Sequence, residues 1–284
     1  MRLTHKWALL LLGPPIVFLI AFFIVPFLMI VVSSVHDTHG GWTFANYAKV
    51  LGDLYYWRTL LLTFKLSLGV TLVSLAIGYP LAFYMTNVLK KRTVRRLFYI
   101  VVVTPLFTSN IVRAFGWMVL LGRVGMINNA LTSLGLIDRP LPLLFSQTGI
   151  VIGLSYIMTP FMVLTVASVL QTIDRSLEDS AQDLGASRLT TFLKVTLPLS
   201  LPGVIAGSLI VFTLSVSAYV TPSILSGGKD IVMSMLIFEQ YASVFNFQFG
   251  ATLAVVLLVT TIVLVGGYLL VIERGIRNST EAAR

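Results

Sequence analysis

Six long apolar runs alternate with short polar segments along the chain, and this pattern decides the fold class. The runs cover residues 8–32, 59–85, 97–121, 147–170, 202–222 and 248–272. Each is long enough to cross the hydrocarbon core of a bilayer, which needs about 20 helical residues. Polar backbone groups inside a bilayer must be satisfied within their own segment, so each run is predicted to be a helix. The sequence therefore predicts an all-α integral membrane protein, with six transmembrane helices in a single domain over residues 1–284.

The longest polar interruption on the C-terminal side, residues 174–202, has the pattern of a helix, a bend and a second helix. Leu177, Ala181 and Leu184 recur at a spacing that places them on one helical face, turned away from the acidic side chains. Gly185 is predicted to end this first helix, because a residue without a Cβ can adopt the left-handed conformation of a helix C-terminus.

The second helix of this loop is predicted to begin at Ser187, which can cap its first turn. Its apolar face is predicted to contain Leu189, Phe192 and Leu193. Pro198 and Pro202 are predicted to end it before the next apolar run. Periodicity alone leaves two interpretations open: a pair of helices that lies on lipid, or a surface that docks on a partner.

Composition excludes most soluble and catalytic classes. The chain is 57% hydrophobic and only 11% charged, whereas about a quarter of the residues of soluble domains are charged. It contains no cysteine, which excludes disulfides and thiolate chemistry. Its three histidines lie outside the apolar runs, and His36 with His39 is too small a set for a metal site. No catalytic residues and no metal ligands are therefore predicted.

The distribution of basic residues predicts the orientation. If the N-terminus is cytoplasmic, thirteen of the 20 lysines and arginines lie on the cytoplasmic side, with the largest group at residues 90–96. Both termini and the 174–202 loop are then cytoplasmic. The basic excess behind the formal net charge of +9 is explained by loops that face lipid head groups, so no nucleic-acid partner is expected.

The chain carries no motif for energy conversion of its own. The one Gly-Gly-Lys sequence, at residues 227–229, is followed by Asp230 where a phosphate-binding loop needs Ser or Thr. Inside the apolar runs the only ionisable groups are Lys65 and Arg113. A gradient-driven carrier usually has an acidic side chain or a broken helix near the midplane, so the absence of a buried carboxylate argues against that class.

The 174–202 loop resembles the EAA loop of inner-membrane permeases in binding-protein-dependent ABC importers. The resemblance rests on Asp179-Ser180-Ala181, three residues, Gly185, nine residues, and then Val195-Thr196-Leu197-Pro198. Asp179 stands where the family has Glu, with Glu178 next to it, and Ser180 stands where the family has Ala. In that family the loop docks on the ATP-hydrolysing subunit. The resemblance implies these coupling residues: Glu178, Asp179, Ala181, Leu184, Gly185, Phe192, Val195, Leu197 and Pro198.

A second motif is similar to the spermidine/putrescine-type branch of these permeases. It runs from Pro105 through Arg113, Trp117 and Gly125 to Asn128, and with the loop it extends the resemblance over nearly the whole chain. The resemblance implies the type I importer permease (MetI-like) fold in a bacterial inner membrane. It also implies a second permease as a heterodimer partner, two ATPase subunits that bind ATP and Mg, a periplasmic binding protein, and no cofactor in this chain.

The residues of a translocation pathway are less sharply predicted. The candidates are Arg113, Trp117, Tyr156, Thr213, Ser217 and Tyr219. Aromatic faces attract cations weakly, and the hydroxyls at i and i+4 can line a passage. The same hydroxyls can instead bond to carbonyls of their own or neighbouring helices, and Arg113 can be structural.

The substrate class follows from the resemblance alone. The spermidine/putrescine-type branch implies import of a polyamine delivered by an external receptor. The branch also handles other small cationic or zwitterionic solutes, such as opines, aminophosphonates and amino-acid derivatives. The alternative from another class is a stand-alone, gradient-driven carrier.

Overall fold

The structure, a computed structural model, describes the backbone of residues 5–37 and 40–281, and the side chains of residues 11–37 and 40–270. In these ranges the regular structure is helical apart from one antiparallel bridge between His36 and Trp42, and turns and loops join the helices. The chain forms two compact units: unit 1 consists of residues 1–58 and 233–284, and unit 2 of residues 59–232. The single domain over residues 1–284 stays a prediction.

The six predicted membrane-spanning segments are present in the described part of the chain. The helices long and apolar enough to cross a bilayer are Leu11–Ser34, Leu54–Val88, Asn110–Ser133, Gln147–Leu170, Arg188–Ser217 and Phe247–Leu270. The first, second, fourth and sixth overlap the predicted runs closely, and the fifth begins earlier than its run. The third lies further along the chain than residues 97–121, because the helix is interrupted within that run.

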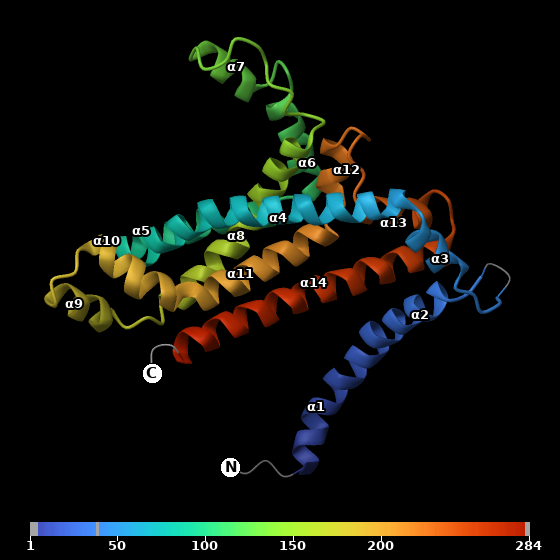
Figure 1. The fold of residues 1–284 in the computed structure, drawn as a ribbon, viewed down its shortest axis with the longest axis horizontal. Coiled ribbons are helices and arrows are strands. Elements are labelled where there is room, and N and C mark those ends of the chain that lie inside the picture. Colours follow the sequence, from blue (N-terminus) through green and yellow to red (C-terminus); the bar gives the residue numbers. More distant parts are fainter. Residues whose placement is uncertain (1–4, 38–39, 282–284) are drawn as a thin grey trace. The chain divides into compact units, whose positions relative to one another are not determined.

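Unit 1 contains the first and last crossings. Its helices are α1 (His5–Leu19), the π turn η1 (Ile20–Ile24), α2 (Val25–Ser34), α3 (Ala45–Gly52), α13 (Met233–Ala242) and α14 (Phe247–Glu281). The helix α14 packs against α2 and α13 (Figure 1). Polar groups hold α2, α3 and α14 together. The Tyr47 and Ser34 hydroxyls are 2.7 Å apart, and Thr252 Oγ1 donates to the Ser34 carbonyl at 3.0 Å.

Unit 2 contains the middle crossings. Its elements are α4 (Leu54–Phe83, from residue 59), η2 (Tyr84–Val88), α5 (Arg92–Val103), η3 (Thr104–Phe107), α6 (Asn110–Leu121), α7 (Met126–Ser133), α8 (Gln147–Leu170), α9 (Arg175–Asp183), α10 (Arg188–Thr191), η4 (Phe192–Thr196), α11 (Leu197–Ser217) and α12 (Val220–Leu225). Figure 1 shows α8 and α11 side by side, and these two helices pack against each other along their length.

Glycines allow the helices of unit 2 to approach each other closely around α8. A Cβ on Gly78 of α4 would lie 2.9 Å from Met162 Cγ, and one on Gly207 of α11 would lie 2.8 Å from Met162 Sδ. The Met162 side chain is fully buried. Small residues at such crossings let van der Waals packing and backbone proximity replace the hydrophobic effect, which is weak between helices in lipid.

The third predicted crossing is not one continuous helix, so that part of the prediction is wrong. The helix α5 passes into the 3₁₀ turn η3, and the chain is then extended at Thr108 and Ser109 before α6 begins. Pro105 lies in η3 and is buried. Because proline has no N–H and its ring clashes with the preceding turn, it interrupts the helix in the middle of an apolar run.

The fifth crossing is longer at its N-terminal end than predicted. The helical path runs from Arg188 to Ser217 without interruption, so Pro198 and Pro202 do not end the second helix of the polar loop. The π turn η4 immediately precedes Pro198, which occupies the first turn of α11. Proline is tolerated in a first turn, and a π turn re-arranges the hydrogen bonds before it.

Candidate functional site

The first helix of the 174–202 loop ends at the residue that the sequence predicts, and Asp174 caps its beginning. The Asp174 carboxylate accepts from the Ser176 amide at 3.0 Å, and the hydrogen bonds from the Ser176 backbone and side chain hold the Asp174 pKa below its usual value. At the other end, Gly185 has φ +87°, and the Ala186 amide donates to the Ala181 carbonyl at 3.0 Å. This bond pattern closes a helix through a left-handed residue.

The second helix begins at Ser187, as predicted, since its side-chain oxygen accepts from the Thr190 amide at 3.2 Å. Figure 1 shows α9 and α10 together at the end of unit 2 where α5 begins, while α12 lies at the far end of α11. The loop is therefore a helix pair whose second helix continues into a membrane-spanning helix.

Four leucines of the 174–202 loop are exposed, and we call this set the leucine face. Its members are Leu177, Leu184, Leu189 and Leu193, which are 48%, 90%, 68% and 51% exposed. Ala181, predicted to share this surface, is half-buried. Exposed apolar side chains clustered on a protruding element are typical of a binding surface.

Phe192 does not belong to the leucine face, so its predicted grouping with Leu189 and Leu193 is wrong. Its ring lies against two aromatic rings of α4, with centroid distances of 6.1 Å to Tyr79 and 5.2 Å to Phe83. Phe192 is the first residue of η4, whose wider turn changes the angular register of a helix. The half-buried Phe192 thus anchors the loop to unit 2. Val195 and Leu197 are half-buried too, and Pro198 is exposed.

The two acidic residues of the coupling motif have different surroundings. Glu178 Oε1 accepts from Thr196 Oγ1 at 2.6 Å and from Asn87 Nδ2 at 3.3 Å. It therefore joins α9 to η4 and to the end of the second crossing, whereas Asp179 is exposed. Asn87 and Thr196 were not predicted as site residues. Asn87 lies 91 positions from Glu178, so no local pattern could have shown the contact.

A second bond fastens α9 in the same place, because Arg175 Nη2 donates to the Thr86 carbonyl at 3.2 Å. Together these contacts attach α9 to η2 and to η4, which leads into α11. Glu178, Arg175 and Phe192 therefore hold the loop to unit 2 on its inner side.

Replacing Glu178 by alanine is expected to lower the stability of the purified chain, whereas Asp179→Ala changes little. A hydrogen bond to a charged group contributes about 1.5–3 kcal/mol, reduced here because the site is only partly buried. A thermal melt should show a fall of a few degrees in Tm for Glu178→Ala only. Equal melts for the two variants would contradict the fastening role.

Trp117 and Tyr156, both predicted pathway residues, lie together in unit 2. Their ring centroids are 5.6 Å apart and the ring planes meet at 68°, an edge-to-face arrangement. Gly153 lies beside them: a Cβ there would be 3.9 Å from Trp117 Cδ1 and 3.1 Å from Thr221 Cγ2. Elements α6, α8 and α12 thus meet at this aromatic pair. Tyr156 is 43% exposed, so part of this pair reaches the surface of the chain.

Arg113 lies one turn before Trp117 on α6 and is buried. Its Nη2 donates to Asn110 Oδ1 at the start of the same helix. Its Nε and Nη1 atoms are buried and have no hydrogen-bond partner in the described part of the chain. A buried guanidinium with two unbonded nitrogens is costly, which makes this residue a functional suspect.

The predicted hydroxyl stripe of the fifth crossing is satisfied within its own helix. Thr213 Oγ1 donates to the Leu209 carbonyl at 2.8 Å, and Ser217 Oγ donates to the Leu214 carbonyl at 3.1 Å. Both side chains are exposed, so their oxygens still offer acceptor positions on the outside of α11. Tyr219 is half-buried and follows the extended residue Ala218, which separates α11 from α12.

Two consecutive hydrogen bonds at the other end of unit 2 were also not predicted from the sequence. Lys65 Nζ donates to Gln147 Oε1 at 2.9 Å, and Gln147 Nε2 donates to Asp230 Oδ1 at 2.9 Å. These two hydrogen bonds connect α4, the start of α8 and the loop after α12. Lys65 is thus partnered by polar groups rather than left alone in an apolar run.

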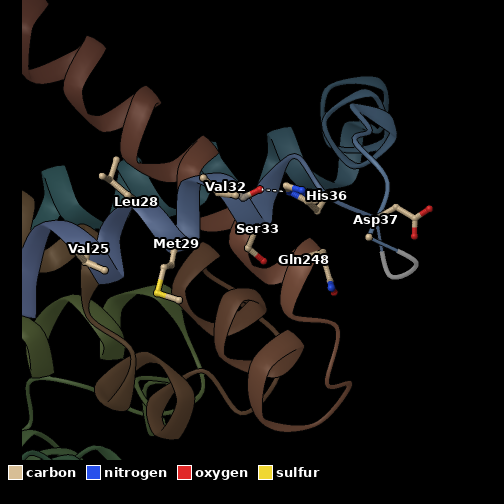
Figure 2. Close-up of a pocket in the computed structure, with 9 residues that line it drawn as sticks. Val25, Leu28, Met29, Val32, Ser33, His36, Asp37 and Gln248 are labelled. Carbon is tan, nitrogen blue, oxygen red and sulfur yellow. Dashed lines mark hydrogen bonds between the residues drawn. The ribbon is translucent and has the colours of Figure 1, made fainter. Parts of the chain in front are cut away.

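Unit 1 contains a pocket of about 580 Å³ that is mostly apolar. It is lined by Val25, Leu28, Met29, Val32, Ser33, His36, Asp37, Gly40 and Gln248. Figure 2 shows the His36 ring turned back to the Val32 carbonyl, which is 2.7 Å from Nδ1. Among the described residues no group of three potential metal ligands comes together, and His39 and the side chain of His5 lie outside the described part.

Comparison with known proteins decides the family. The model of the family "Binding-protein-dependent transport system inner membrane component" matches residues 77–277. The chain belongs to this family. The match spans both the 174–202 loop and the aromatic pair, so the resemblance predicted from the EAA-like spacing is confirmed.

Several similar proteins belong to spermidine/putrescine transport systems. The spermidine/putrescine transport system permease protein PotB of Salmonella typhimurium (strain SL1344) is 30% identical over 263 residues, 90% of this chain and 91% of that protein. PotB of Escherichia coli (strain K12) is 34% identical over 215 residues, 76% of this chain and 77% of that one. The chain is accordingly a multi-pass inner-membrane permease subunit of an ABC importer. It is not an enzyme, since a separate ATPase hydrolyses ATP.

Solved structures support the fold. A chain of a bacterial ABC transporter involved in import of the acidic polysaccharide alginate matches with a TM-score of 0.73 at 20% identity, covering 95% of this chain and 96% of that one. A second alginate transporter structure, in complex with a substrate-bound periplasmic protein, matches with a TM-score of 0.69 at 19% identity, covering 92% of each chain. The predicted importer permease fold is therefore confirmed.

Proposed function

We propose that the chain is one of two permeases of a heterodimeric importer for polyamines, with its termini and the 174–202 loop in the cytoplasm. The observation that supports this substrate most strongly is the 30–34% identity to spermidine/putrescine permeases over 76–90% of the chain. The basic excess around residues 90–96 supports the orientation.

The 174–202 loop is proposed to be the element that the ATPases move when they close. Two ATPase subunits bind ATP and Mg, no cofactor is bound by this chain, and each ATPase holds one permease through the leucine face. Closure of the ATPases then moves α9, and the attachments of Glu178, Arg175 and Phe192 transmit this displacement to η2 and α11. The two permeases alternate in this way between inward-open and outward-open states.

Substrate passage is proposed to involve the aromatic pair Trp117–Tyr156 and the acceptor oxygens of Thr213 and Ser217. No carboxylate lies in the predicted membrane-crossing runs, so a polyamine would meet ring faces and hydroxyls rather than a buried countercharge. Each cation–π contact contributes only about 0.5–2 kcal/mol, which favours rapid passage over tight binding. Affinity would then reside in the binding protein.

The test of the substrate is uptake by the complete complex in proteoliposomes: this permease, its partner permease, the ATPases and the neighbouring binding protein. ATP-dependent accumulation of radiolabelled spermidine or putrescine is expected, with none when the binding protein is omitted. Accumulation of a zwitterionic solute in place of polyamines would overturn the polyamine proposal and leave the importer subunit intact.

Replacing Trp117 by alanine is expected to lower the maximal rate of polyamine uptake about three- to tenfold, because one of two ring faces is lost. Trp117→Phe keeps a ring and should retain most of the rate. Binding-protein affinity serves as the control, since it should stay unchanged. Equal rates for the alanine and phenylalanine variants would argue against a direct contact between ring and cation.

A second candidate substrate class is favoured by Arg113. Its two buried, unbonded nitrogens in the described structure are suited to a carboxylate or phosphonate group, such as an amino-acid derivative or aminophosphonate carries. Competition by such solutes in the same uptake assay separates the two classes: inhibition by a zwitterion but not by putrescine would favour the second.

A further inference from the structure

A cluster of five basic residues surrounds the start of α5 without any acidic neighbour in the sequence. Its members are Lys90, Lys91, Arg92, Arg95 and Arg96. No Asp or Glu occurs between Asp53 and Asp138. In the part of the chain that the structure describes, none of the three arginines takes part in an ion pair. The cluster therefore has a positive charge that the fold itself does not neutralise.

Three of these residues line a hollow rather than pointing separately into solvent. The hollow has a volume of about 490 Å³ and is lined by Arg92, Thr93, Arg95, Arg96 and Tyr99. The lining therefore supplies three positively charged guanidinium groups, which only donate hydrogen bonds, and two neutral hydroxyls. Arginine forks match the paired oxygens of a phosphate, so the chemistry fits a phosphate ester.

The hollow adjoins a smaller polar pocket that reaches the coupling loop. This second pocket, of about 260 Å³, shares Arg95 and also contains Arg175, Glu178, Asn87 and Gln171 in its wall. Gln171 Nε2 donates to the Tyr99 hydroxyl at 2.7 Å, so the wall between the two spaces is held in place. A ligand in the hollow would thus sit next to the residues that fasten α9.

The apolar continuation of α5 indicates what carries the phosphate. Arg92, Arg96 and Ile100 follow one another at intervals of four, so basic and apolar side chains share one side of the helix. The next turns expose Leu97, Ile100 and Val101, which are 58%, 56% and 63% exposed. A soluble phosphate compound would make no favourable contact with this apolar surface, whereas lipid acyl chains would pack against it.

We infer that Arg92, Arg95 and Arg96 bind the phosphodiester of an anionic phospholipid, whose acyl chains lie along Leu97, Ile100 and Val101. The inference rests on the proposed orientation, which places the start of α5 at the cytoplasmic head groups. Basic pockets at that level favour anionic lipids. The bound lipid would brace Arg95 and Tyr99 behind the fastening of the coupling loop.

The experiment compares two double variants that remove the same charge from the same basic cluster. Arg92→Gln/Arg96→Gln changes the hollow, whereas Lys90→Gln/Lys91→Gln leaves every residue that lines it intact. The complex of the two permeases and the two ATPases is purified in detergent, titrated with phosphatidylglycerol, and analysed by native mass spectrometry, with phosphatidylethanolamine as the neutral lipid. The arginine variant is expected to bind phosphatidylglycerol about tenfold more weakly, and the lysine variant about as tightly as the unaltered complex.

Several results would overturn the inference. An equal loss in both variants would show a diffuse charge effect, and an unchanged titration in the arginine variant would show that the lipid binds elsewhere. Loss of the ATPase subunits with lipid binding retained would assign the cluster to a protein interface. If the double arginine variant fails to assemble, Arg92→Gln and Arg96→Gln are titrated singly. Lipid binding is measured without ATP, substrate or binding protein. A negative lipid result therefore does not contradict the polyamine proposal, and a negative uptake result does not contradict lipid binding.

Discussion

Replacement of Gly185 by valine is expected to reduce ATP-dependent uptake by about tenfold or more while the chain still inserts into the membrane. Gly185 has φ +87°, a conformation that costs an L-residue about 1–2 kcal/mol, and a β-branched side chain more. A Cβ at this position would meet nothing within 4 Å, so the effect comes from the backbone and not from a clash. A changed turn would re-aim α10 relative to α9 and split the leucine face.

The matched control is Gly135→Val. Gly135 has φ +67°, also has open space around its Cβ, and lies in a different loop, between α7 and α8. It carries the same kind of backbone strain without touching the leucine face. Uptake in proteoliposomes and co-purification of the ATPase should fall in the Gly185 variant and stay near the unaltered level in the control.

A third variant separates conformation from side-chain identity. Asparagine tolerates the left-handed region better than other non-glycine residues, so Gly185→Asn should keep most of the uptake. If valine and asparagine at this position behave alike, or if Gly185→Val transports normally, the turn does not determine coupling.

The local parts of the site could be predicted from the sequence, because each depends on neighbouring residues. The helix over 175–183, its end at Gly185 and the cap at Ser187 all follow from side-chain chemistry within a few positions. The membrane-spanning runs follow from length and hydropathy in the same way. These features need no knowledge of what the helices pack against.

The misplaced features depend on backbone details or distant contacts. The π turn before Pro198 let the helix continue where proline usually ends one, and the same turn moved Phe192 from the leucine face onto Tyr79 and Phe83. The break after Pro105 lies inside a run whose hydropathy gives no sign of it. Hydropathy shows how far an apolar segment extends, but it does not show where the backbone hydrogen bonds of that segment are re-arranged.

The fastening of the loop could not be predicted, since its partners are distant in the sequence. Glu178 meets Asn87, and Arg175 meets the Thr86 carbonyl, across about 90 residues. These contacts assign different roles to adjacent acids: Glu178 holds the loop to its own chain, and the exposed Asp179 remains available to a partner. The loop motif therefore combines an internal attachment at Glu178 with an exposed carboxylate at Asp179.

Replacement of Leu184 by aspartate is expected to release the ATPase from the permease without unfolding it. Leu184 is 90% exposed, so within this chain it contributes little to stability, and its substitution should change the free energy of unfolding by less than about 0.5 kcal/mol. In the proposed complex the same side chain is buried by the ATPase. Burying a leucine stabilises by about 1.5–3 kcal/mol, and a buried carboxylate adds a desolvation penalty. The dissociation constant should then rise at least about tenfold.

The control for this variant is Leu136→Asp, at a leucine that is 67% exposed in the loop before α8. It introduces the same charge on the opposite side of the membrane in the proposed topology. ATPase binding is measured on the purified permease pair by titration with labelled ATPase, and folding by a thermal melt. A large loss of binding with an unchanged melt for Leu184→Asp alone would locate the ATPase on the leucine face. Equal binding by both variants would move the docking surface off α9, and would leave the internal attachments of Glu178 and Phe192 as structural features only.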